Sequence, residues 1–134
     1  MNQSQTRAQS HQRTLEQRRA AEAWQCVDAV RKTPYADEYG QLAREAASLV
    51  QMHGLGQTLA FLKAKAKEKE NEHQHLARDL SRWVSRQLLG EARDDLREWI
   101  VNQATVAEYR RATLEALAFL TWLKRFAEAE LVKE

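Results

Sequence analysis

The spacing of apolar residues between Tyr39 and His53 constrains the fold most strongly. When successive residues are placed 100° apart, as in an α-helix, a narrow arc contains Tyr39, Leu42, Ala43, Ala46, Leu49, Val50 and His53. This pattern predicts an amphipathic helix. We expect it to end at Gly54, because glycine best takes the left-handed position just past a helix.

The same periodicity continues on both sides of this segment. An earlier helix opens at Thr14, which resembles a capping box with Gln17, and it stops before Thr33-Pro34. Its apolar face carries Ala20, Ala23, Trp24, Val27 and Val30. After the glycine, a third helix turns Leu55, Leu59, Leu62 and Ala66 inward, and it fades into the charged stretch KAKAKEKENEHQH, which is an exposed helix or a loop.

Three further helices are predicted in the second half of the chain. One spans about Leu76 to Leu89 and ends at Gly90, and a short one shows Leu96, Trp99 and Ile100. The last opens at a second capping box, Thr105 with Glu108, and runs to about Leu131. With only 4 Gly and 1 Pro and no run of alternating β-branched residues, the chain is predicted to be all-α, a compact bundle of five to six helices.

Composition limits the domain organisation and the classes of function. Residues 1–13 are polar and are expected to form a flexible tail, and residues 14–134 a single helical domain. The net charge of +2 does not by itself indicate a nucleic-acid binder. The single Cys26 excludes an internal disulfide framework. No apolar run reaches the ~20 residues that span a bilayer, and the N-terminus lacks a secretion signal, so we expect a cytoplasmic protein without membrane contact.

The two glycines in MHGLGQTLAFLKAKAK, residues 52–67, do not form a phosphate loop. Their spacing lacks the Lys-Ser/Thr of a Walker loop and the third glycine of a dinucleotide fingerprint, and no strand precedes them. The segment Gly54, Leu55 and Gly56 is therefore interpreted as a helix junction. We expect Gly54 to cap one helix, Leu55 to pack back onto it, and Gly56 to let the backbones approach closely as the next helix starts.

No residue pattern indicates catalysis. Cys26 is better explained as a small core residue than as a nucleophile, and His53 as a half-buried residue at a helix end. The side chains of His73 and His75 point to different sides of a helix, so no metal site is predicted. The pair Asp94-Asp95 is expected in the first turn of a helix, where the helix dipole favours negative charge. We expect no enzyme, no catalytic residue, no cofactor and no small-molecule substrate.

Basic residues recur in rows. Arg78, Arg82 and Arg86 are four residues apart, a rise of about 6 Å that is close to the spacing of phosphates along one strand. Two similar rows, Lys63 with Lys67 and Lys65 with Lys69, follow the glycine pair. Such arginines can contact phosphates, but they can equally be solvated or pair with Asp79 or Glu72. No aromatic residue interleaves with these rows, so any RNA contact is expected to be independent of base sequence.

The last helix is apolar over an unusually wide arc. Val106, Tyr109, Ala116, Leu117, Leu120 and Leu123 form one stripe, and Phe119, Trp122 and Phe126 form a second. Such a helix either lies at the centre of the core or serves two surfaces. If the second stripe is exposed, Phe119, Trp122 and Phe126 are candidates for a subunit interface.

Three segments resemble the small helical subunit of the type III-B (Cmr) CRISPR effector complex. They are EQRRAAEAW, MHGLGQTLAFL and ATLEALAFLTWLKRFAEAEL, and the resemblance extends from about Thr14 onward, with residues 63–74 matching least. The matching residues in the second and third segments are Gly54, Leu55, Leu59, Phe61, Ala116, Leu117, Trp122, Leu123, Lys124, Arg125 and Phe126. Most of these are packing residues.

The resemblance implies a non-catalytic structural subunit of an RNA-guided antiviral complex. Its partners would be other subunits of the effector complex, copies of itself, and guide and target RNA. The candidate phosphate contacts are Arg18, Arg19, Lys63, Lys67, Arg78, Arg82, Arg86, Lys124 and Arg125. Two alternatives remain: a helical adaptor that binds only proteins, and a small nuclease or transferase that would use His53 or Cys26.

Overall fold

The computed structural model describes residues 13–131, which form six α-helices and no β-strand. The helices are α2 (Leu15–Val30), α3 (Ala36–His53), α4 (Leu55–Ala66), α5 (Glu72–Leu89), α6 (Arg97–Asn102) and α7 (Val106–Glu130). The predicted all-α bundle of five to six helices is confirmed. The predicted flexible tail, residues 1–13, lies outside the described residues except for Arg13.

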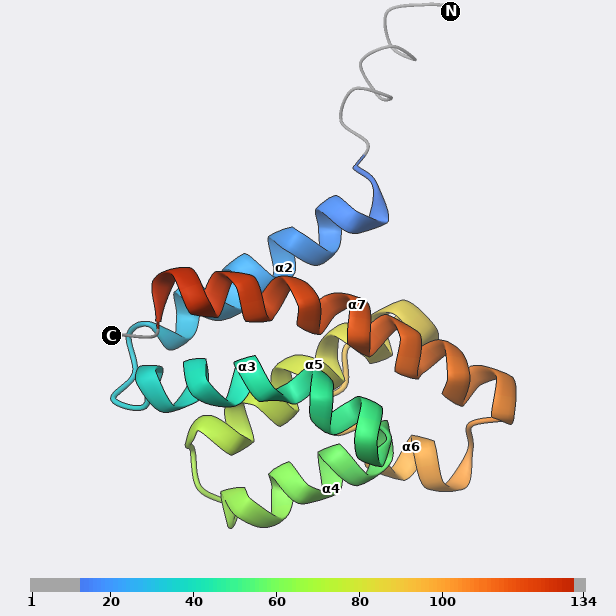
Figure 1. Cartoon of the computed structure of the whole chain (residues 1–134). Coiled ribbons are helices and arrows are strands. Elements are labelled where there is room, and N and C mark those ends of the chain that lie inside the picture. The colour runs from blue at the N-terminus through green and yellow to red at the C-terminus, as the bar shows by residue number, and fades with distance from the viewer. Residues whose placement is uncertain (1–12, 132–134) are drawn as a thin grey trace, which may run out of the picture.

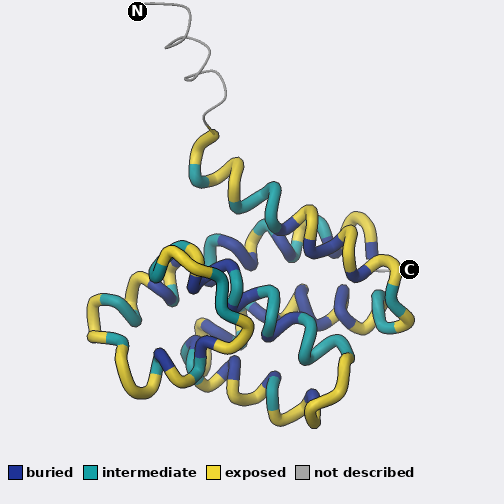
Figure 2. The backbone as a smooth tube through the Cα atoms, turned by 180° about the vertical axis from the view of Figure 1, so that it is seen from behind, coloured by how far each residue is buried: buried dark blue, intermediate teal, exposed yellow. Residues whose placement is uncertain are grey.

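The long helix α7 organises the bundle. Figure 1 shows α7 running across the molecule with α2 beside it and α3 and α5 behind and below it. Helices α2, α3 and α5 all pack against α7, while α4 packs on α3 and α5 and α6 packs on α4. In Figure 2 the buried stretches of these helices face one another and the exposed stretches lie outside. The three-to-four spacing of apolar residues thus becomes one shared core.

The core draws on every helix. Leu residues dominate it. Four aromatic residues, Tyr39, Trp83, Trp99 and Phe119, join them and are each at most 4% exposed. Its other large members include Val27, Val30, Val50, Leu55, Leu59, Leu62, Leu76, Leu80, Val84, Leu96, Leu120 and Leu123. Leu55, Leu59, Leu62 and Ala66 point inward from α4, as predicted.

Side-chain caps set several helix ends. Thr14 and Thr105 each form the predicted capping box, with the Thr hydroxyl accepting a hydrogen bond from the backbone N–H of Gln17 or Glu108 at 3.1 Å. The cap of α5 was not predicted: Asn71 Oδ1 accepts from the Gln74 N–H at 3.0 Å. Helix α5 therefore begins at Glu72, four residues before the predicted start at Leu76.

The charged stretch after α4 is a turn followed by helix. Helix α4 ends at Ala66, and Lys67 and Glu68 have positive φ angles of 54° and 59°. The Asn71 side-chain amide donates to the Ala66 carbonyl at 3.0 Å and ties the turn together. Lys67 therefore does not continue a helical row from Lys63, and this part of the prediction is wrong.

Gly54 joins α3 directly to α4, in a conformation that differs from the predicted one. Its φ of 89° is positive, but its ψ of 158° is extended, so it is not in the left-handed helical region. This combination is accessible almost only to glycine. A Cβ on Gly54 would lie 3.2 Å from the Tyr109 hydroxyl, and one on Gly56 would lie 3.3 Å from Ile100 Cγ2. The junction is confirmed, but the close approach is to side chains of α6 and α7 rather than to the backbone.

Three residues that helical spacing assigns to apolar faces are exposed. Trp24 is 45% exposed and Val106 is 78% exposed, and His53 is exposed rather than half-buried. Val106 begins α7 and His53 ends α3, and Trp24 lies at the margin between α2 and α7. Periodicity predicts which face of a helix is apolar but not how far the neighbouring helix extends along it. None of the helices between residues 13 and 131 has the length and apolar content needed to cross a membrane.

We expect Gly54→Val to lower the free energy of unfolding by about 2 kcal/mol or more, because valine is strained at this φ and ψ and would crowd Tyr109. Gly90→Val is the matched control. Gly90 also has positive φ, but no atom lies within 4 Å of a Cβ there, so only the backbone strain of about 1 kcal/mol applies. Urea unfolding of both variants measures the difference. A Gly54→Val protein as stable as the parent would contradict the role assigned to this junction.

Candidate RNA and subunit interfaces

The arginine row on α5 is paired with carboxylates of the same chain. Arg78 contacts Glu70 at 2.6 Å, Arg82 contacts Asp94 at 2.7 Å, and Arg86 contacts Glu22 at 3.3 Å. The partners come from the turn before α5, the loop after it, and α2. Of the alternatives left open by the sequence, the structure shows pairing, but with Glu70, Asp94 and Glu22 rather than with Asp79 or Glu72.

These arginine pairs remain partly exposed to solvent. The three arginine side chains are 31–42% exposed, and exposed ion pairs contribute roughly 0–1 kcal/mol each. The hydrogen bonds from Arg78 hold the pKa of Glu70 below its ordinary value. A phosphate could replace these carboxylates at a small energetic cost, but the row offers less positive charge than its sequence indicates.

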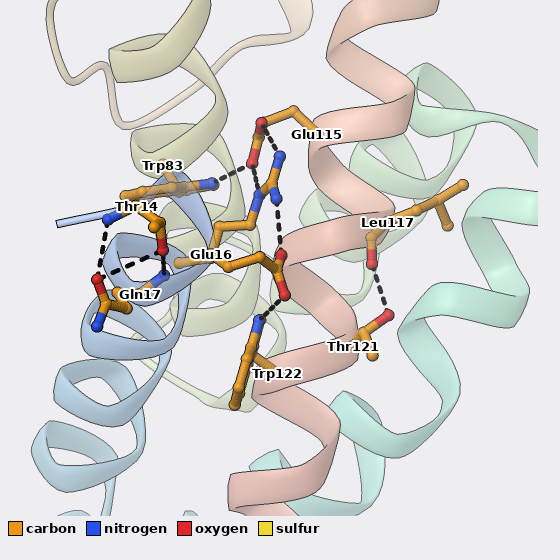
Figure 3. A network of polar contacts seen from close by, with 9 residues as sticks. Thr14, Glu16, Gln17, Trp83, Glu115, Leu117, Thr121 and Trp122 are labelled. Carbon is orange, nitrogen blue, oxygen red and sulfur yellow. Dashed lines mark hydrogen bonds and ion pairs between the residues drawn. The ribbon is translucent and has the colours of Figure 1, made fainter.

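Arg19 is a structural residue. Its guanidinium donates to both oxygens of Glu115, from Nε at 2.7 Å and from Nη2 at 2.9 Å, and to Glu16 at 2.7 Å. The indole N–H of Trp83 also donates to Glu115, at 2.9 Å. Figure 3 shows this network between α2, α5 and α7, extending from Trp83 through Glu115 and Glu16 to Trp122. Arg19 is 17% exposed and is already bound by two carboxylates, so it is less available to RNA phosphates than its place among the candidate contacts indicates.

The charge of Glu115 depends on these hydrogen bonds. Glu115 is only 9% exposed, and burial alone would raise the pKa of its carboxyl group. The hydrogen bonds from Arg19 and Trp83 outweigh burial and hold this pKa below its ordinary value. A carboxylate at this position thus joins three helices without leaving an unpaired charge in the core.

The other predicted cations differ in whether they contact a polar or acidic side chain of the same chain. Lys63 is half-buried and donates to Gln74 Oε1 at 2.8 Å, and Arg125 lies 4.0 Å from Glu128. Within residues 13–131 no ion pair involves Arg18, Lys67 or Lys124. These three are the predicted cations that have no carboxylate partner among the described residues, and Arg18 and Lys67 are also exposed.

Lys124 lies in a polar groove between α3 and α7. The groove has a volume of about 460 Å³, and its lining includes Gln41 and Arg44 from α3 and Lys124 from α7, together with Glu45 and Glu128. Arg44 has no ion-pair partner among the described residues either. Sequence reasoning missed this pair, because Arg44 and Lys124 are 80 positions apart and meet only in the folded bundle.

The aromatic residues of α7 divide between the core and the surface. Phe119 is fully buried and stacks on Trp83 with ring centroids 5.7 Å apart. Its predicted place in a subunit interface is therefore wrong. Trp122 and Phe126 are half-buried, and the exposed Trp24 packs edge-to-face on Phe126 at 5.4 Å. We call Trp24, Trp122 and Phe126 the aromatic surface.

The aromatic surface is hollowed. A groove of about 450 Å³ runs between α2 and α7, lined by the three aromatic residues and by Arg13, Glu16, Gln17, Ala20, Ala21 and Gln25. The indole N–H of Trp122 donates to Glu16 at 3.2 Å, which fixes the ring at the groove edge. Exposed aromatic groups held in this way are typical of protein interfaces.

The groups that catalysis would need are enclosed or far apart. Cys26 is 6% exposed, and burial raises the pKa of its thiol well above the ordinary value. It lies beside Asp79 and Tyr39, near the start of α3, whereas His53 ends that helix about 21 Å from Tyr39 along the axis. His53 therefore cannot act as a base for Cys26.

Asp79 is the centre of an enclosed hydrogen-bonded cluster between α3 and α5. The Tyr39 hydroxyl donates to Asp79 at 2.7 Å, and His75 Nε2 lies 3.5 Å from the same oxygen. His75 Nδ1 is 2.9 Å from the Tyr35 hydroxyl. Burial raises the pKa of Asp79 to about 7, and burial lowers the pKa of His75.

The described residues offer no metal site. From residue 13 to residue 131, no three His, Cys, Asp or Glu side chains are grouped so that they could hold an ion. The predicted position of Asp94-Asp95 in a first helical turn is wrong, because both precede α6. Asp94 pairs with Arg82, and Asp95 accepts from the backbone N–H and the guanidinium of Arg97.

Comparison with known proteins gives the family. The family model for CRISPR-associated protein Cas_Cmr5 matches residues 15–130. The chain belongs to the Cmr5 family. The CRISPR system Cmr subunit Cmr5 of Thermus thermophilus is 35% identical over 122 residues, covering 91% of this chain and 99% of that protein. The crystal structure of a Cmr5 family protein from Thermus thermophilus superposes with a TM-score of 0.71 at 35% identity and covers 90% of this chain and all of that one.

Asp79 predicts a pH dependence of stability. An unfolded Asp ionises near pH 4, so between about pH 4 and pH 7 the folded Cmr5 family chain binds more protons than the unfolded one. The contribution of Asp79 to stability is therefore present at low pH and is lost as the pH rises through this window. His75 acts oppositely, because its lowered pKa removes stability as the pH falls below about 6.5.

We expect Asp79→Asn to gain stability relative to the parent between pH 5 and pH 8, by at most about 3 kcal/mol, because the amide carries no charge to bury. Melting temperatures of both proteins at the two pH values measure this change. Since His75 is present in both proteins, the difference between them reports mainly on Asp79. An equal difference at pH 5 and pH 8 would show that Asp79 does not titrate in this range.

Proposed function

We propose that this protein is a non-catalytic structural subunit of a type III-B CRISPR effector complex. In this proposal it stacks with copies of itself and with backbone subunits, and it contacts guide or target RNA through phosphates. Family membership over residues 15–130 supports the class of complex. One contrast supports the structural role. The reactive side chains Cys26 and Asp79 are enclosed, whereas Trp24 of the aromatic surface is 45% exposed.

The aromatic surface supports docking onto another protein. Phe126 already packs against both Trp24 and Trp122, so little side-chain freedom remains to be lost when a partner covers them. Tryptophan at the centre of an interface commonly contributes a large share of the binding energy. Phe119 of α7 is buried against Trp83 and is not part of this surface.

Contact with RNA phosphates is supported by the cations that the fold leaves unpaired. Arg44 and Lys124 flank one groove, and Arg18 and Lys67 are exposed. The α5 arginines are a second set, which would have to exchange a carboxylate for a phosphate. Each contact is weak alone, but a stack of subunits along one RNA would multiply the contacts through high effective concentration.

A protein-only adaptor is the second candidate. The ion pairs of Arg78, Arg82 and Arg86 favour it, because they remove the longest row of cations from the free surface. The two candidates share the aromatic surface and differ in whether charge reversal changes RNA binding.

We expect Trp24→Ala combined with Phe126→Ala to reduce incorporation into the complex by about tenfold, because truncating paired aromatic anchors removes interface area. Phe61→Ala is the matched control, since Phe61 is an aromatic residue on α4 that is also exposed, at 42%. The chain is co-expressed with the other Cmr subunits of its genome, and its share is measured after size exclusion. Undiminished incorporation of a folded double variant would contradict docking through this surface.

We expect Arg44→Glu combined with Lys124→Glu to weaken binding of labelled target RNA by the assembled complex on the order of fivefold, and less so as salt is raised. Lys32→Glu with Arg110→Glu is the charge-matched control, because these exposed residues lie outside the groove. The triple variant Arg78→Glu, Arg82→Glu and Arg86→Glu tests the paired row. Unchanged RNA binding in both sets, with normal incorporation, would favour the adaptor.

A further inference from the structure

A third groove lies at the other end of α7, between α4 and α6. It has a volume of about 700 Å³ and a mainly apolar lining that includes Ala60, Ile100, Val101 and Tyr109. Val101 is 77% exposed, and Val106, which begins α7, is 78% exposed. Two exposed valines near an apolar groove are typical of a surface that another protein covers.

The groove depends on the glycine junction. Gly56 forms part of its lining and carries no side chain, and a Cβ there would lie 3.3 Å from Ile100 Cγ2 and 3.5 Å from the Tyr109 hydroxyl. The backbone N–H of Gly56 donates to that hydroxyl at 3.0 Å. The polar end of Tyr109 is therefore satisfied within the chain, and the groove offers a ligand mostly apolar contact.

The charge around this groove is negative. Residues 91–109 carry a net charge of −3, from five carboxylates and two arginines, in a chain whose net charge is +2. Both arginines are already paired, Arg93 with Glu91 at 2.9 Å and Arg97 with Asp95 at 2.8 Å. The charged residues that line the groove itself are Asp95, Arg97 and Glu98, with a net charge of −1, and Arg97 is already paired, so the groove lining offers RNA phosphates no free cation.

Glu98 lines the groove and has no cationic partner among the described residues. Its oxygens accept only from neutral amides, those of Asn102 at 3.3 Å and Gln103 at 3.2 Å. A carboxylate beside an apolar groove is complementary to a lysine or arginine that follows an apolar side chain.

We propose that this groove binds a segment of a different protein that places an apolar side chain between α4 and α6 and a lysine or arginine against Glu98. The proposal rests on the proposed function, since the partner would be another subunit of the same complex. Two copies of this chain meeting through the same face would bring two negative surfaces together, which disfavours that contact.

Photo-cross-linking in the assembled complex tests the proposal. The full chain carries p-benzoylphenylalanine in place of Val101 or, as a control, in place of Leu114, which is 62% exposed on α7. After irradiation, mass spectrometry identifies the linked peptide. We expect the Val101 position, unlike Leu114, to link to another subunit at a peptide with an apolar residue within about four positions of a lysine or arginine, one turn of a helical segment.

Charge variants test the part played by Glu98. Glu98→Lys should lower the yield of the Val101 link about fivefold or more, and Glu98→Gln should lower it less. Glu68→Lys is the control, because it makes the same charge change at an exposed residue of the α4–α5 turn and should leave the yield unchanged. Unchanged yield with Glu98→Lys would overturn the assignment of a cationic partner.

The outcomes separate this proposal from the proposed function. If the unmodified chain is not retained with the other Cmr subunits, the proposed function fails. If the chain is retained but Val101 links to RNA, to a second copy, to a peptide without a nearby cation or to nothing, the groove proposal alone is overturned.

Discussion

The structure depends on the burial of α7 against α2, α3 and α5 at once. Phe119, Leu120 and Leu123 are fully buried there, and a polar side chain in the same interface must be satisfied from the neighbouring helices. Glu115 is satisfied in this way by Arg19 of α2 and Trp83 of α5. The packing of α7 therefore gives Arg19, a candidate phosphate contact in the sequence, a structural partner within the chain.

The sequence predicted the elements whose signals are local. Thr14 and Thr105 cap helices through residues three positions away, and Gly90 ends α5 in the left-handed conformation, so these boundaries could be predicted without knowing the fold. The start of α5 was missed because the Asn71 cap lies among lysines and glutamates that are equally typical of a loop. The ψ angle of Gly54 was missed because Tyr109, 55 positions away, constrains that junction.

The candidate surfaces were predicted less well, because they depend on contacts between distant segments. The row Arg78, Arg82 and Arg86 is visible in the sequence, but Glu22 is 64 positions from the arginine that it pairs with. Helical spacing placed Phe119 and Trp122 on one stripe, but Phe119 is buried in the fold. The third residue of the aromatic surface is instead Trp24 of α2, which packs on Phe126. Neither the sequence of α3 nor that of α7 predicts that Arg44 and Lys124 line the same groove.

The mild net charge conceals an uneven distribution of charge along the chain. With −3 in residues 91–109 and +2 in the whole chain, the remaining residues carry +5. On the proposed function, RNA phosphates would contact Arg44 and Lys124 in the polar groove, whose lining also contains Glu45 and Glu128, and would find no free cation in the lining of the apolar groove beside Glu98. Phosphate contact would therefore favour one orientation of the subunit. Apolar contacts at both ends of α7 would then hold that orientation, which requires no reactive group and no recognition of base sequence.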